Sequence, residues 1–339
     1  MKTTNHIPMK TNHALCGLIP GLLSRALITP LLAITAMFAA PSAARAGLIL
    51  YVSPGNGSGS QTIDKVSSTG VVSTFATLSA GSTPLAGLAF DTAGNLYVAV
   101  DAYANQNNNR IDKVTPGGVV STFVPLPFGS NPLGMAFDSS GNLYVAINGN
   151  PTNNTIDKIT PGGSVSLFAT LAPSNNPIGL AFDVSGNLYV SGNNGSYTTS
   201  TIDKITPGGS VSVFASMPGT SAPAGLVFDS SGNLYVADGF NKVEKITPGG
   251  AVSTFATLAA GSGAIGLAID GIGDIYVAES GLNKIIEITP DGLTTTDFAT
   301  GISVPAFLAF GPVPEPGTAL FGIACVGVAA LRRRRAAAV

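Results

Sequence analysis

The chain repeats one phrase six times, most clearly as Gly134-Met-Ala-Phe-Asp-Ser-Ser-Gly-Asn-Leu-Tyr-Val-Ala146 followed by Ile156-Asp-Lys-Ile-Thr-Pro-Gly-Gly163. The shared aspartate recurs at intervals of 47, 45, 46 and 41 residues, counted along Asp91, Asp138, Asp183, Asp229 and Asp270. These intervals match the length of a four-stranded propeller blade. Because a unit of this length cannot bury its own apolar faces, the repeat predicts stacked units around a shared core.

Each unit reads as four short strands, which we letter A to D. In the third copy they are expected at 179–182, 188–191, 201–205 and 210–214, with tight turns at 183–187 and 206–209. The apolar runs show no helical periodicity, and Gly, Pro, Asn and Ser separate them.

The number of blades follows from the two ends of the repeat region. Five units are complete, and residues 48–52, 63–66 and 71–75 supply strands B, C and D of a sixth. Its strand A is found at 304–310, so one blade is assembled from both ends and leaves no open sheet edge. We predict an all-β fold, a six-bladed β-propeller of four-stranded blades, over residues 47–311.

The phrase Phe-Asp-x-x-Gly-Asn-Leu-Tyr-Val-Ala, with Pro-Gly-Gly in the next hairpin, resembles NHL-type propeller repeats. It is also similar to the wider group of gluconolactonase, regucalcin and virginiamycin B lyase propellers. The resemblance covers residues 47–311 and implies the fold. It leaves the activity open, because such folds host many functions.

The N-terminal residues 1–46 have the features of a signal peptide. Basic residues precede an apolar run at 26–40, and small residues follow it. We place cleavage by signal peptidase after Ala44 and Ala46, before Gly47. A membrane anchor is the alternative, and translation starts at Met1 or at Met9, where the opening residues nearly repeat.

The C-terminal residues 312–339 resemble the PEP-CTERM sorting signal of Gram-negative bacteria. A Pro-Glu-Pro motif, a short apolar stretch at 317–331 and a basic end follow one another in order. The motif residues are Val313, Pro314, Glu315 and Pro316, and the basic residues are Arg332, Arg333, Arg334 and Arg335. The resemblance implies transient anchoring in the inner membrane, removal of the tail by an exosortase, and delivery to the cell surface or a biofilm matrix. An ordinary single-span anchor is the alternative.

Composition narrows the function once both ends are set aside. Eight of the 16 basic residues lie in the ends, so eight remain against the 18 acidic residues between Asp64 and Glu315, and the net charge of the mature protein is about −10. Such a surface disfavours nucleic acid and anionic membrane. The histidines, His6 and His13, and the cysteines, Cys16 and Cys325, lie in the ends too. The propeller therefore has no Ser-His-Asp triad, no histidine-ligated zinc and no disulfide.

The repeated acids have a structural interpretation. An Asp at the first position of a turn accepts backbone N–H bonds, and Gly at the fourth supplies a positive φ. A second repeated pair, Asp-Lys in strand C, as in Asp203-Lys204, suggests ion pairs between neighbouring blades. Solvated charges near the rim are the alternative.

Ligand-binding residues are expected where the copies differ. The B–C loops are long and Asn-rich at 53–62, 101–110, 148–155 and 193–200, and short at 238–241 and 279–283. Their amides and tyrosines suit neutral sugars. The predicted ligand-binding residues are Tyr103, Asn105, Asn107, Asn150, Asn153, Asn194 and Tyr197.

A metal-dependent enzyme would use the acids and amides near the channel. Carboxylates and amides that follow strand B or precede strand A could hold one divalent cation, as the resemblance to gluconolactonase-like propellers implies. The predicted ligands are Asp238, Glu279, Asp101, Asn131 and Asn176. The virginiamycin B lyase type would instead require a histidine, which residues 47–311 lack.

We therefore expect an exported, surface-sorted propeller that acts as a noncatalytic binding or scaffold module in an extracellular polysaccharide matrix, with no catalytic residues and no required cofactor. The alternatives are a metal-dependent, lactonase-like hydrolase and a purely structural matrix protein.

Overall fold

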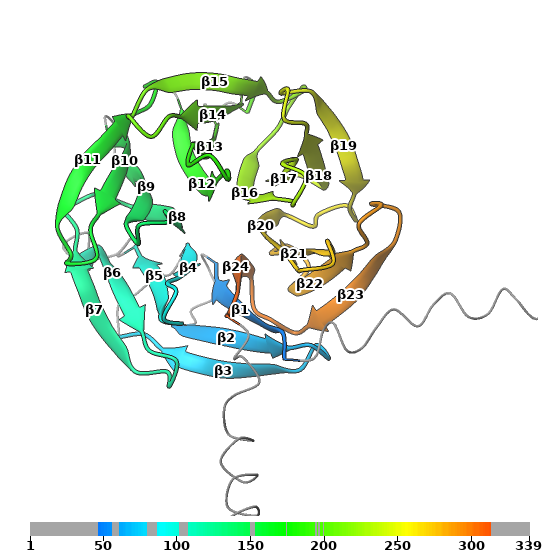
Figure 1. Ribbon diagram of the computed structural model, residues 1–339. Coiled ribbons are helices and arrows are strands. Elements are labelled where there is room, and N and C mark those ends of the chain that lie inside the picture. Colours follow the sequence, from blue (N-terminus) through cyan, green and yellow to red (C-terminus); the bar gives the residue numbers. More distant parts are fainter. Residues whose placement is uncertain are drawn as a thin grey trace, which may run out of the picture. The chain divides into compact units, whose positions relative to one another are not determined.

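The computed structural model describes residues 47–55, 61–79, 87–101, 108–149, 153–173, 175–193, 195, 197–198 and 200–312. These residues form a ring of six four-stranded antiparallel sheets, with one strand of each sheet at the centre and one at the rim (Figure 1). The predicted six-bladed propeller is confirmed. The described part of the chain contains no α-helix, and thus none that could span a membrane.

We number the blades along the chain and list strands A to D of each in order. Blade 1 contains β4 (Leu88–Phe90), β5 (Leu96–Val100), β6 (Arg110–Val114) and β7 (Val120–Pro125). Blade 2 contains β8 (Pro132–Phe137), β9 (Leu143–Gly149), β10 (Asn153–Ile159) and β11 (Val165–Thr170). Blade 3 contains β12 (Asn176–Phe182), β13 (Leu188–Asn193), β14 (Thr201–Ile205) and β15 (Val211–Ser216). Blade 4 contains β16 (Pro223–Phe228), β17 (Leu234–Asp238), β18 (Lys242–Ile246) and β19 (Val252–Thr257). Blade 5 contains β20 (Ala264–Ile269), β21 (Ile275–Glu279), β22 (Lys284–Ile288) and β23 (Thr295–Thr300).

Blade 6 closes the ring. It is ordered β24 (Pro305–Phe310), β1 (Ile49–Pro54), β2 (Thr62–Ser67) and β3 (Val72–Thr77), so strand A comes from the far end of the chain. β24 pairs with β1 in the register Leu50↔Phe310. The predicted shared blade is therefore confirmed.

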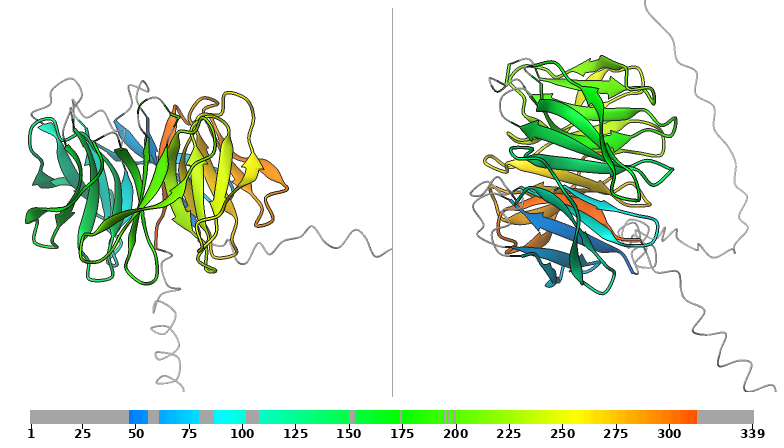
Figure 2. Two further views of the ribbon diagram at one scale, coloured as in Figure 1. Left: turned by 90° about the horizontal axis from the view of Figure 1, so that it is seen from above. Right: turned by 90° about the vertical axis from the view of Figure 1, so that its left-hand side faces the viewer.

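The turns between strands A and B use the repeated aspartate as predicted. Asp183 accepts bonds at Oδ1 from the backbone N–H groups of Ser185 and Asn187, at 2.9 and 2.8 Å. Its Oδ2 accepts from Asn187 Nδ2 at 2.8 Å, and Gly186 has φ 79°. The same turn recurs at Asp91, Asp138 and Asp229 with the same three bonds. We call this face of the ring, seen edge-on in Figure 2, the turn end.

A tyrosine in strand B joins blades 1, 2, 3, 5 and 6 each to the next blade through an edge-to-face aromatic contact. Tyr189 of blade 3 meets Phe214 of its own strand D edge-to-face, with ring centroids 4.9 Å apart. It meets Phe228 of blade 4 in the same way at 5.0 Å. Burial of these rings and their edge-to-face geometry both stabilise the junction.

The expected ring of Asp–Lys pairs between blades is wrong. Lys204 lies 5.3 Å from the centroid of Tyr189 and 3.9 Å from Asp183, and both partners belong to its own blade. Asp203, on the opposite face of the strand, accepts from Asn175 at 2.6 Å and Thr201 at 3.2 Å. Because adjacent strand residues point to opposite faces, the two charges acquire separate partners.

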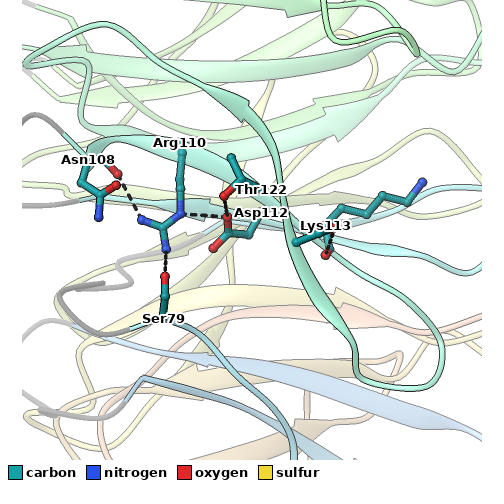
Figure 3. A network of polar contacts seen from close by, with 7 residues as sticks. Ser79, Asn108, Arg110, Asp112, Lys113 and Thr122 are labelled. Carbon is teal, nitrogen blue, oxygen red and sulfur yellow. Dashed lines mark hydrogen bonds and ion pairs between the residues drawn. The ribbon is translucent and has the colours of Figure 1, made fainter.

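Blade 1 satisfies its strand C acid differently (Figure 3). Arg110 is 5% exposed, and its Nε lies 2.8 Å from Asp112 Oδ1. The guanidinium also donates to Ser79 Oγ at 2.6 Å and to the Asn108 carbonyl at 3.2 Å. Ser79 follows β3 of blade 6, so this buried charge network joins blade 1 to the closing blade.

Around the channel, the A strands touch backbone to backbone. A Cβ added to Gly134, Gly179 or Gly225 would lie 2.3, 2.2 or 2.6 Å from a carbonyl oxygen of the next blade. Gly87 and Gly266 occupy the same position in blades 1 and 5, with contacts of 2.2 and 2.3 Å. The corresponding residue of blade 6 is Phe307.

Candidate functional site at the channel mouth

The face opposite the turn end carries the B–C loops, and the central channel opens there into a pocket of about 350 Å³. We call it the mouth pocket. Its lining comes from blades 2 to 6: Leu133, Asn148, Ile178, Asn193, Tyr197, Ala222, Ala224, Gly239, Gly263, Ala264, Ile265, Ser280 and Phe307. All of these side chains are uncharged at neutral pH, so the pocket suits a neutral ligand.

The wall of the mouth pocket is apolar because of its place in the repeat. Leu133, Ile178, Ala224 and Ile265 each precede the channel glycine of strand A. A bulge at this point, as between Pro177 and Leu180 in blade 3, interrupts the A–B pairing. Bulges re-aim side chains, and here the apolar residue lines the pocket.

The rim is polar and uncharged. Asn148, Asn193 and Ser280 occupy one equivalent position, five residues after the first residue of strand B in blades 2, 3 and 5. Tyr197 is 40% exposed and meets Phe240 of the neighbouring loop edge-to-face, with centroids 5.9 Å apart. Amides, a hydroxyl and an aromatic face thus surround an apolar interior.

Of the predicted ligand-binding residues, the structure describes two, Tyr197 and Asn153. Tyr197 lines the mouth pocket. Asn153 begins β10, where its backbone pairs with Gly149, so the hairpin of blade 2 extends into the predicted loop. The remaining predicted positions, Tyr103, Asn105, Asn107, Asn150 and Asn194, lie outside the described residues.

Sequence reasoning missed the other rim residues and Phe307. The rim residues share one alignment position after strand B, and Phe307 replaces a glycine of the other copies. Both signals are visible when the six copies are aligned residue by residue.

Of the predicted metal ligands, Asp238 acts as a loop cap. The residue is 3% exposed, and its Oδ1 accepts from the backbone N–H of Ala222 at 3.0 Å and of Phe240 at 3.3 Å. Asp238 lies on the same face of β17 as Leu234 and Val236, which pack in the apolar cluster between blades 3 and 4. Its carboxylate therefore holds the strand A approach and the short B–C loop together.

Glu279 lies in a different crevice, between blades 4 and 5. Lys284 Nζ is 3.6 Å from Glu279 Oε2 and 2.6 Å from Asp297 Oδ1. The crevice of about 80 Å³ is bordered by the end of β19. Burial raises the pKa of Glu279, and the charge of Lys284 offsets this in part.

The other three predicted ligands sit at strand ends. Asp101 is buried after β5, and Asn131, with φ 41°, donates to the Asn148 carbonyl at 3.3 Å. Asn176 starts β12 opposite Asn193. No three acid, histidine or cysteine side chains within the described ranges are grouped to hold a metal ion.

The sequence profile of the virginiamycin B lyase family matches residues 103–320, more than half of the chain. Among curated proteins, no sequence matches.

Similar solved structures include selenomethionine-substituted virginiamycin B lyase from Staphylococcus aureus, with 21% identity, TM-score 0.53, and coverage of 66% of this chain and 72% of that chain. A catalytically inactive histidine-to-alanine variant of the same enzyme with quinupristin has 18% identity, TM-score 0.56, and coverage of 78% and 92%. A nidogen/laminin complex has 18% identity, TM-score 0.64, and coverage of 78% and 98%. At these identities the structural likeness concerns the fold.

Proposed function

This chain belongs to the virginiamycin B lyase family, and from that premise we propose that its propeller is an exported, noncatalytic binding or scaffold module of an extracellular polysaccharide matrix. The observation that carries the proposal is the mouth pocket, with its uncharged rim and apolar interior. Neutral hydroxyl-rich ligands are recognised by amides, hydroxyls and aromatic faces of this kind.

The difference from the lyases supports binding rather than catalysis. A virginiamycin B lyase in which one histidine is changed to alanine is catalytically inactive. In this chain His6 and His13 both precede the propeller segment of the sequence. The carboxylates that a metal-dependent hydrolase would use are engaged elsewhere: Asp238 caps a loop, and Glu279 pairs with Lys284.

Delivery to the matrix rests on the two ends of the sequence, which lie outside the described residues. Signal peptidase would remove residues 1–46, and an exosortase would remove the tail after transient anchoring. Mass spectrometry of the exported protein should find no peptide containing Arg332, Arg333, Arg334 or Arg335. A surface form that keeps this segment would contradict sorting and favour a permanent anchor.

The binding test uses the exported protein and extracellular polysaccharide purified from the bacterium that carries it. Wild type should co-sediment with the polysaccharide, and the double change Tyr197→Ala with Asn193→Ala should weaken binding about tenfold. Val184→Ala, at a fully exposed residue of the turn end, is the matched control and should bind as wild type does. Equal binding by all three proteins would remove the mouth from the proposal.

The catalytic alternative is checked on the same preparations. Lactone hydrolysis and streptogramin B cleavage should stay at the rate of the buffer, with and without Ca²⁺, Mn²⁺ or Zn²⁺. A metal-dependent rate that falls in Asp238→Asn or Glu279→Gln would contradict a noncatalytic role.

A further inference from the structure

The channel of this propeller is blocked at one level by a side chain that the repeat does not supply. In blades 1 to 5 the residue at the point where neighbouring A strands touch is glycine, at Gly87, Gly134, Gly179, Gly225 and Gly266. In blade 6 it is Phe307, which is 8% exposed. A phenyl ring thus occupies a position where five blades project no side chain.

Phe307 lies between two cavities. Above it is the mouth pocket of about 350 Å³, and beyond it is a deeper channel cavity of about 110 Å³. Among the described residues, Phe307 is the one residue common to both linings. It therefore separates them.

The contacts of Phe307 reach across the channel. It belongs to the core cluster of blades 6 and 1, against which Ile178 of blade 3 and Ile265 of blade 5 also pack. Phe307 is the member of that cluster that shares the mouth-pocket lining with these isoleucines. The ring and the two isoleucines form an apolar floor.

The two cavities differ in chemistry. In the deeper one, Met135, Leu180 and Leu226 turn their side chains into the clusters between blades. Between them stand glycines whose neighbours are backbone carbonyl oxygens. The wall below Phe307 is therefore largely polar backbone, and the space above it is bounded by apolar side chains.

We propose that Phe307 is the specificity-determining residue of the mouth pocket, and that it makes this pocket blind and selective for an uncharged molecule with a sugar-like polar end and an apolar end. The apolar end rests on Phe307 between Ile178 and Ile265. The polar end meets Asn148, Asn193, Ser280 and Tyr197 at the rim. The inference rests on the proposed function and adds the ligand class.

The physical consequence concerns water. With Phe307 in place, an apolar group at the floor leaves water completely, and each buried methylene strengthens binding about fourfold. With glycine there, the pocket joins the backbone-lined cavity below, and water reaches the buried end of the ligand. The gain per methylene then disappears.

The test uses calorimetric titration of the folded protein with methyl, butyl and hexyl β-D-glucopyranoside. Wild type should bind the hexyl compound at least about 30-fold more tightly than the methyl compound. Phe307→Gly should reduce this ratio below about threefold. Phe310→Leu, in the same strand but packed on Tyr276 away from the pocket, is the control and should keep the wild-type ratio.

A second variant covers a failure to fold. Phe307→Leu keeps an apolar side chain where the A strands touch, and it should give a ratio between those of wild type and Phe307→Gly. Thermal unfolding followed by circular dichroism shows which variants are folded. A ratio equal to that of Phe310→Leu in either folded Phe307 variant would overturn the inference.

The remaining outcomes separate the inference from the proposed function. If wild type binds the polysaccharide but shows no preference for the hexyl compound, or binds none of the glucosides, the inference is overturned and the proposed function stands. If wild type binds neither the polysaccharide nor a glucoside, both are overturned.

Discussion

The two faces of the propeller differ in how far the blades resemble one another. At the turn end, four blades contain the same turn with the same hydrogen bonds, whereas on the opposite face the polar contacts differ from blade to blade. At the turn end, Asp91, Asp138, Asp183 and Asp229 make the same three bonds in four blades. Toward the opposite face, where strand C follows the B–C loop, the acid of strand C meets Arg110 in blade 1, Asn175 in blade 3 and Lys242 in blade 4. A feature that is needed in every blade supports the fold, and we expect recognition on the face where the blades differ.

A substitution in the ring of channel glycines should have the largest effect on the stability of the fold. Gly179→Ala places a Cβ about 2.2 Å from the Ala224 carbonyl oxygen, so two A strands must separate. We expect a loss of about 3 kcal/mol in the free energy of unfolding, measured in urea. Gly271→Ala is the control, because no atom lies within 4 Å of the added Cβ. It should change stability by less than about 0.5 kcal/mol.

The buried network of blade 1 comes next. Arg110→Met leaves Asp112, 1% exposed, without its cationic partner. Breaking a buried pair in this way costs about 3 kcal/mol. The double variant with Asp112→Leu removes both charges and should recover most of the loss. A double variant as unstable as Arg110→Met would show that the pairing does not account for the effect.

A turn aspartate should have a smaller and pH-dependent effect. Asp183→Ala removes three hydrogen bonds and should cost about 1–2 kcal/mol at pH 7. Burial pushes the pKa of Asp183 up, but the bonds from Asn187 and Ser185 and the charge of Lys204 outweigh it and hold the pKa below its ordinary value.

The sign of the pH effect follows from that lowered pKa. The contribution of Asp183 is complete above the pKa of the unfolded chain, about 4, and is lost as the pH falls through the folded value. The difference between wild type and Asp183→Ala should therefore shrink between pH 5 and pH 2. A difference that stays constant over this range would contradict the assignment.

Asp203, in strand C, should behave in the opposite way and with the smallest effect. Burial raises its pKa, and the bonds from Asn175 and Thr201 offset this only in part. Its ionisation therefore weakens the folded state as the pH rises from about 4 through the folded pKa. Asp203→Asn should lack this decline. The melting temperature of Asp203→Asn minus that of wild type should therefore increase between pH 4 and pH 7.

The features that sequence predicts well here are those that local chemistry repeats. The Asp-x-x-Gly turn and the Pro-Gly-Gly hairpin each close within five residues, and the period sets the number of blades. The closing blade followed from a missing strand at one end and an extra strand at the other. Strand A began earlier than predicted in blade 3, because its pairing resumes beyond a bulge that the apolar pattern does not reveal.

The candidate site was harder, because its chemistry depends on which face of a strand each residue occupies. Glu279 lies on the same face of β21 as Ile275 and Val277, which face blade 4. Its side chain therefore enters the crevice between blades 4 and 5. Asp238 likewise follows Leu234 and Val236 toward blade 3. The prediction of a shared metal site did not consider this alternation. Phe307 could be aligned with the glycines, but its reach across the channel depends on the closed ring.

A crystal structure of the propeller soaked with hexyl β-D-glucopyranoside tests most directly the claim that recognition belongs to the mouth. We expect one bound molecule, with its alkyl chain on Phe307 between Ile178 and Ile265 and its sugar at Asn193 and Tyr197. Density for the ligand in the crevices of the turn end, or alkyl density passing beyond Phe307 into the deeper cavity, would contradict it.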